Sequence, residues 1–169
     1  LTIKCDTPIE TGFVSRAQGS TLKNITIVNA DVKNTASTRT GILGGELYMS
    51  TVENCFTTGT VTITDEAKVL GPSGKQRGGI AGEAASTTLK NCGTSLDVVC
   101  DNSAFENCFY VAETDNDNKN GTTNIPSADM ITSGEAAYIM NEALGSTVWY
   151  QNIDATETAD LAPVASNAG

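Results

Sequence analysis

Histidine is absent from the sequence, and its absence removes several kinds of catalytic chemistry. A chain without histidine has no Ser-His-Asp or Cys-His catalytic group, no imidazole metal ligand and no imidazole acid or base. Chemistry that depends on carboxylates, lysine or tyrosine remains open. Aromatic residues make up only 5% of the chain, which is little for an ordinary globular core.

Basic residues are also few, since 10 Lys and Arg stand against 20 Asp and Glu, giving a formal net charge of -10. Nucleic acids and anionic membranes bind to basic surfaces, so we expect neither as a partner. No apolar run approaches about 18 residues, so we expect no membrane insertion. We recognise no signal peptide, and because Leu1–Cys5 already has a strand pattern, we interpret the chain as a fragment or processed segment.

What the sequence does contain is an internal repeat. A glycine block occurs three times and is followed each time by a polar stretch and the pattern Thr-apolar-Lys/Glu-Asn. The blocks are Gly12-Phe13-Val14, Gly41-Ile42-Leu43-Gly44 and Gly79-Ile80-Ala81-Gly82, and the Asn residues are Asn24, Asn54 and Asn91. Ala104-Phe105-Glu106-Asn107 is a weaker fourth copy without a glycine block. Such a pattern predicts short strands separated by turns that contain Gly and Asn.

One copy cannot bury its apolar face alone, so we expect the copies to stack and to pair equivalent strands. The Asn residues should then form a hydrogen-bonded ladder. Lys23, Glu53, Lys90 and Glu106 share one position and should neutralise one another across strands. Cys55, Cys92 and Cys108 share another position and lack metal-site spacing, so we expect small core residues there.

The glycine block followed by Asn-Cys resembles the GLUG motif over about residues 11–112. The copy from Gly79 to Cys92 is the most similar, whereas the first copy departs at Ser15 and Ile25. GLUG repeats occur in large extracellular bacterial proteins, including surface proteins of Bacteroidetes. The resemblance implies repeat architecture and an extracellular or cell-surface location, and it implies no catalytic mechanism.

We therefore expect a mainly β fold, a short β-helix-like solenoid of degenerate GLUG repeats over residues 1–112. Residues 113–153 should form a loop, a helix and a strand that cap the open end of the stack. The helix is expected from Ser133 to Ala143, with a capping box at Thr132 and an end at Gly145. Residues 154–169 are expected to be a linker or tail.

Candidate site residues are few, and we predict no catalytic residue and no cofactor. Asp115 and Asp117 are weak metal candidates, because the spacing of the following residues does not fit a calcium loop. Tyr48, Tyr110 and Tyr150 are weak candidates for stacking on a sugar. The acidic residues Asp31, Glu46, Glu53, Asp65 and Asp97 are assigned to different repeat positions, so no acidic column is expected.

These features favour a non-catalytic repeat module of a bacterial surface or secreted protein that acts in adhesion, with a glycan or a host or matrix protein as partner. A passive stalk is the first alternative. A carbohydrate-active β-helix enzyme is the second, and it would need carboxylates that converge, alone or with Lys or Arg, in a groove.

Overall fold

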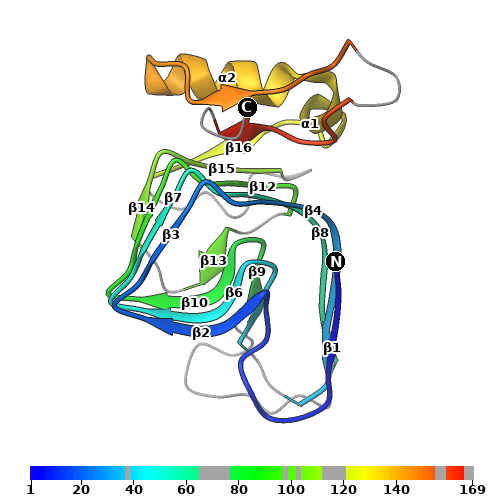
Figure 1. Cartoon of the computed structure of the whole chain (residues 1–169), viewed down its shortest axis with the longest axis vertical. Coiled ribbons are helices and arrows are strands. Elements are labelled where there is room, and N and C mark those ends of the chain that lie inside the picture. Colours follow the sequence, from blue (N-terminus) through cyan, green and yellow to red (C-terminus); the bar gives the residue numbers. More distant parts are fainter. Residues whose placement is uncertain are drawn as a thin grey trace.

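The computed structural model describes residues 1–36, 39–64, 77–96, 99–101, 104–111, 121–154 and 159–165. Within these ranges the fold is mainly β, with parallel sheets in a β-helix-like arrangement (Figure 1). The prediction of a mainly β chain is confirmed.

Three parallel sheets form the body of the molecule. In order of pairing, the six-stranded sheet contains β1 (Thr2–Cys5), β4 (Thr26–Asn34), β8 (Phe56–Ile63), β12 (Gly93–Thr94), β15 (Cys108–Val111) and β16 (Thr122–Ile125). The second sheet contains β13 (Cys100–Asp101), β10 (Ala81–Ala85), β6 (Gly44–Tyr48) and β2 (Val14–Gln18). The third contains β14 (Ala104–Glu106), β11 (Thr88–Lys90), β7 (Thr51–Glu53) and β3 (Thr21–Lys23). A short parallel pair joins β5 (Thr40–Gly41) to β9 (Arg77–Gly78).

The chain follows the same path repeatedly through these sheets. It runs along the second sheet, then the third, then the six-stranded sheet, and returns to the second sheet one strand further on. We call one such passage a coil. Figure 1 looks along the stack, so that β2, β6 and β10 lie behind one another.

Asparagine turns connect the third sheet to the six-stranded sheet. Asn24, Asn54, Asn91 and Asn107 have φ of 57°, 53°, 51° and 51°, the left-handed conformation that Asn tolerates better than most residues. The Asn54 side-chain amide donates to Asn24 Oδ1, and that of Asn91 donates to Asn54 Oδ1, both at 3.2 Å. The predicted ladder is confirmed over these three residues.

The interior between the sheets is filled by side chains from equivalent positions of successive coils. Cys55, Cys92 and Cys108 are fully buried free thiols, as predicted for this position. Their Sγ atoms donate to backbone carbonyl oxygens, for example from Cys92 to Val52 at 3.6 Å. Burial raises the pKa of Cys92, because a thiolate is poorly solvated in an apolar interior.

The two longest strands, β4 and β8, bend at one corner. Asn29 has φ of 53° and Gly59 has φ of 141°, and the pairing register shifts between Ile27 and Ala30. A Cβ on Gly59 would lie 2.1 Å from the Ala30 carbonyl oxygen, so this corner requires glycine. Beyond the bend, β1, β4 and β8 form a separate flank, drawn on the right of Figure 1.

The glycine blocks align differently from the sequence-based expectation. Gly41 lies opposite Gly78, not Gly79, and Gly44 lies opposite Ala81. The second and third copies then match over their whole length. The one-residue irregularity falls in the first copy instead, since Thr11 lies opposite Thr40 but Val14 lies opposite Gly44.

The C-terminal cap contains α1 (Asp129–Ser133), α2 (Glu135–Leu144) and the antiparallel pair of β17 (Trp149–Tyr150) and β18 (Val164–Ala165). Gly134, with φ of 88°, separates the two helices, and neither helix has a side-chain cap hydrogen bond, so the expected capping box at Thr132 is wrong. Gly145 ends α2 in the left-handed conformation, as predicted.

The cap covers the side of the stack rather than its open end, which corrects our expectation. Its buried side chains pack on outward-facing residues of the six-stranded sheet, with the Trp149 and Phe56 rings edge to face at 5.9 Å. Phe56 and Phe109 lie on either side of Gly93 in register, and Met140 packs in the same cluster. Phe56, Phe109 and Trp149 are therefore buried where the cap meets the sheet.

Part of the segment expected to be a linker belongs to this cap. Ala162 and Ala165 are buried, β18 pairs with β17, and Thr26 Oγ1 donates to the Pro163 carbonyl oxygen at 3.3 Å. Residues 159–165 are thus packed structure. In the part of the chain that is described, no helix is long and apolar enough to cross a membrane.

Candidate functional site

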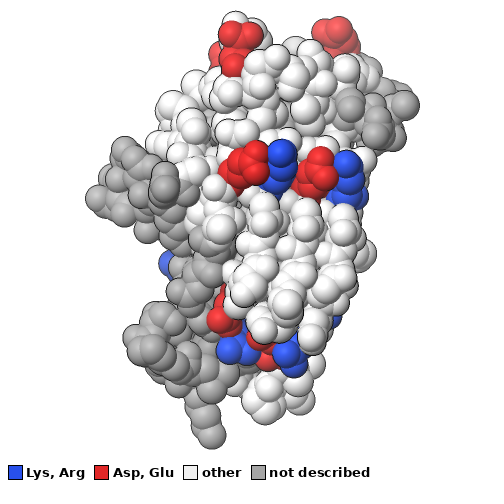
Figure 2. All heavy atoms as spheres, turned by 90° about the vertical axis from the view of Figure 1, so that its left-hand side faces the viewer, with Lys and Arg blue, Asp and Glu red and all other residues white. Residues whose placement is uncertain are grey.

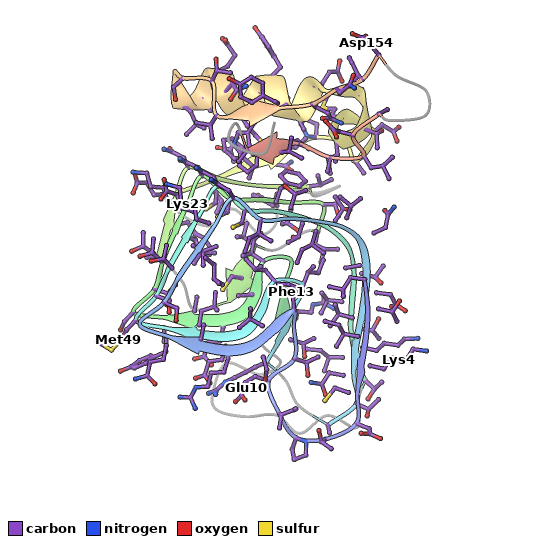
Figure 3. All side chains as sticks on the ribbon, in the orientation of Figure 1. Lys4, Glu10, Phe13, Lys23, Met49 and Asp154 are labelled. Carbon is purple, nitrogen blue, oxygen red and sulfur yellow. The ribbon has the colours of Figure 1, made fainter. Side chains whose placement is uncertain are left out.

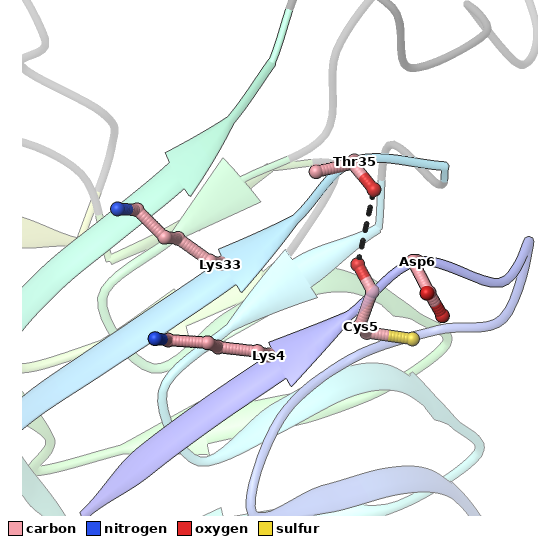
Figure 4. Close-up of a pocket in the computed structure, with 5 residues that line it drawn as sticks. All are labelled: Lys4, Cys5, Asp6, Lys33 and Thr35. Atoms are coloured by element: carbon pink, nitrogen blue, oxygen red, sulfur yellow. Dashed lines mark hydrogen bonds between the residues drawn. The ribbon is translucent and has the colours of Figure 1, made fainter.

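A basic hollow lies on the flank formed by β1 and β4. Lys4 and Lys33 are directly opposite each other in the parallel register, and with Cys5, Asp6 and Thr35 they line a hollow of about 240 Å³. Figure 4 shows the two ammonium groups extending in the same direction, with Asp6 on the far side of Cys5. Lys4 projects from the flank opposite Lys23 (Figure 3).

These two lysines differ from the other described basic residues. Lys23, Lys90, Arg16 and Arg39 each form an ion pair, and Arg77 also has a partner. Lys4 and Lys33 form no ion pair with any described residue, although like charges directly opposite on neighbouring strands are destabilising. The repulsion between them would be relieved by a bound anion.

Cys5 adds a reporter thiol to the hollow. Burial acts to raise its pKa, but hydrogen bonds from Thr7 and Thr11 stabilise the thiolate and lower the pKa overall. Its Sγ lies 3.4 Å from Thr7 Oγ1, and the residue is partly exposed. The other four cysteines are buried, so Cys5 is the accessible thiol.

A second charged cluster surrounds Arg39 and includes side chains from strands of the second sheet. Arg39 Nη1 lies 3.4 Å from Glu10 Oε1 and 3.2 Å from Glu46 Oε1, while its Nε contacts Glu83 Oε2. Arg16 Nε lies 3.3 Å from Glu46 Oε2. Glu46 and Glu83 are mostly buried, and their Oε2 atoms contact guanidinium nitrogens without hydrogen-bond geometry.

This cluster corrects the expectation that the repeat contains no acidic column. Arg16, Glu46, Glu83 and Asp101 lie in one register across β2, β6, β10 and β13. The sequence alignment missed this column because it displaced the third glycine block by one residue. Arg39 forms ion pairs with both Glu46 and Glu83. This arrangement favours a role in neutralising buried charge over the role of the two accessible carboxylates of a glycosidase.

The Lys/Glu column lies on the third sheet, as predicted. Lys23 Nζ is 3.1 Å from Glu53 Oε2, and Lys90 Nζ is 3.0 Å from Glu106 Oε1. Figure 2 shows these two pairs side by side in one row across the sheet, with the second charged group below them. The predicted neutralisation across strands is confirmed.

The predicted aromatic candidates do not form a common surface. Tyr110 is only 1% exposed, so the structure removes it as a sugar-stacking residue. Tyr48 is partly exposed at the end of β6, whereas Tyr150 is 50% exposed on β17 in the cap, on the opposite side of the stack (Figure 1). Trp149, on β17, is buried between the cap and the six-stranded sheet.

The metal candidates Asp115 and Asp117 lie outside the described residues. Among the residues that are described, no three acidic or thiol groups are arranged to hold a metal ion.

Sequence reasoning missed the lysine pair, although a signal was available. Thr2-Ile3-Lys4 aligns with Asp31-Val32-Lys33 when the first strand is treated as part of a preceding coil. No protein-family model, curated protein or solved structure matches the chain.

Proposed function

We propose that this chain is a non-catalytic β-solenoid module of GLUG repeats from a bacterial surface or secreted protein, and that it recognises a ligand bearing an anionic group. The repeated strand order, the Asn ladder and the paired columns support the repeat assignment. The unpaired lysines of the hollow are the single observation that carries the recognition role.

The chemistry of the hollow favours an acidic glycan. Two ammonium groups on neighbouring strands suit one carboxylate or sulfate, and the apolar stems of the lysines can cover part of a sugar ring. Each exposed ion pair contributes about 0.2–1 kcal/mol, so we expect weak binding, on the order of millimolar, which a surface protein would strengthen by multivalency.

The alternatives receive less support from the described residues. A passive stalk does not explain why Lys4 and Lys33 lack ion pairs when Arg16, Lys23, Arg39 and Lys90 all have them. For an enzyme, the convergent carboxylates are those around Arg39, and each of them is occupied by an ion pair.

A sulfated oligosaccharide and its desulfated counterpart, titrated into the purified chain by calorimetry or NMR, test the proposal. We expect saturable binding of the sulfated sugar only, weakened roughly fivefold by K4Q together with K33Q and by raised salt. K23Q and K90Q are matched controls, because each removes a lysine that is already ion-paired. They should leave binding unchanged.

The accessible thiol gives an independent readout. Because its pKa is lowered, Cys5 should react with a thiol reagent near neutral pH, and bound ligand should slow that reaction. Equal binding of both sugars would place the site elsewhere. Absence of binding at about millimolar sugar, from a folded sample, would make the stalk the better account.

A further inference from the structure

The first coil leaves one end of the stack open. Strands β1, β2 and β3 are the edge strands of their sheets, and each pairs on one side only. We call the surface made by these three strands and Phe13 the N-terminal face. Edge strands with free backbone groups are templates for another parallel strand.

The core is also unfinished at this face. Phe13 is 57% exposed, whereas Leu43 and Ile80, which follow it in the same column, are fully buried. Leu22 is only partly buried, while Val52 and Leu89 in its column are fully buried. At the other end, Phe105 of the edge strand β14 is also only partly buried, but Cys100 of the edge strand β13 is fully buried, so neither of these core side chains is exposed to the extent of Phe13.

The Asn ladder and the Lys/Glu column indicate which residues an additional coil next to the first coil should have. Each ladder amide donates to the preceding Asn, which leaves Asn24 Nδ2 without a partner among the described residues. Lys23 is paired with Glu53 on one side and has no neighbour on the other. The alternation of the column therefore calls for an acid beside Lys23 and an Asn beside Asn24.

We propose that the N-terminal face is a docking surface for a further coil of the same repeat, whose chain would connect to the stack at Leu1. The entry point suits this occupant, since Asp31 N donates to the Leu1 carbonyl oxygen at 2.8 Å and Thr2 lies opposite Asp31. A segment arriving at Leu1 would come from the position opposite Thr26, beneath the cap, as β4 does in the first coil.

The second coil provides a ready test segment. Gly59 lies opposite Ala30, the residue that Leu1 matches, so a copy of residues 41–58 can be fused directly ahead of Leu1. The added copies of Glu53 and Asn54 would then lie beside Lys23 and Asn24. We expect a higher denaturant midpoint, an m-value larger by roughly a tenth, and slower amide exchange in β2 and β3.

Two matched controls make the result specific. A fusion carrying a scrambled segment of the same composition should leave all three quantities at the values of the unmodified chain. A fusion whose added copy carries Glu53→Lys should gain less, and the deficit should shrink in high salt. The inference is overturned if the native and scrambled fusions behave alike.

A second copy of the chain is the competing occupant. Sedimentation of the unmodified chain distinguishes it, because docking between copies predicts association that grows with concentration and protects β2 and β3. Such association would overturn the assignment to a joined coil. A monomer, together with stabilisation by the native fusion only, would support it.

Discussion

At the scale of single residues, the asparagine turns have two separable roles. The side chain of Asn54 both donates and accepts within the ladder, and its backbone has a φ of 53° that costs most residues about 1–2 kcal/mol. Each hydrogen bond contributes about 0.5–1.5 kcal/mol net. The two roles predict different responses to replacement by Ala and by Gly.

We expect Asn54→Ala to lower the free energy of unfolding by about 2–4 kcal/mol, because both the ladder bonds and the conformational preference are lost. Asn54→Gly keeps the left-handed preference and should lose less, in spite of the entropy that glycine adds to the unfolded chain. Denaturant unfolding of both variants measures the difference. Equal losses would show that the backbone conformation contributes nothing.

The sequence was sufficient to predict the ladder contact of Asn54, the ion pairing of Glu53 and the burial of Cys55. Residues at the same repeat position lie opposite each other on paired strands. The same logic failed for Glu83, since the block Gly78-Gly79 offers two alignments and nothing in its composition selects one. The structure selects Gly78 because Gly41 has to lie opposite it for β6 and β10 to pair in register. Arg39 comes from outside the repeat pattern, so periodicity could not place it.

At the scale of elements, the cap depends on two outward-facing phenylalanines. Phe56 lies beneath Trp149, which is the only tryptophan of the chain and therefore a specific fluorescent reporter of this contact. The sequence predicted a helix and a strand in the cap but placed them at the end of the stack. Phe56 and Phe109 were the missed signal. Each directly follows an inward-facing cysteine, so each faces outward and has to be covered by another part of the chain.

We expect Phe56→Ala to destabilise the fold by about 3–5 kcal/mol and to shift the Trp149 emission to longer wavelength as water reaches the indole. Tyr150→Ala, in the same short strand but half exposed, should change both quantities little. An unchanged emission spectrum in Phe56→Ala would contradict the packing of the cap on the sheet.

At the scale of the whole molecule, stability should increase from the open end inward. Leu22 and Leu89 occupy the same column, but Leu89 is fully buried and Leu22 is partly exposed. We expect Leu89→Ala to cost about 2–5 kcal/mol and Leu22→Ala clearly less, because a cavity forms only where neighbours enclose the side chain. Chemical denaturation of the two variants compares them, and equal losses would show that the first coil is as enclosed as the third.

The antiparallel pair of β17 and β18 gives the molecule a defined mechanical weak point. The two strands form a sheet of their own, whereas the coils are joined by sheets of four and six strands. A force drawing the C-terminal end away from the stack would act first on Val164 and Ala165 and peel them from Trp149. The cap would therefore unfold at a lower force than the coils and lengthen the chain slightly. The stacked coils would remain folded at that force.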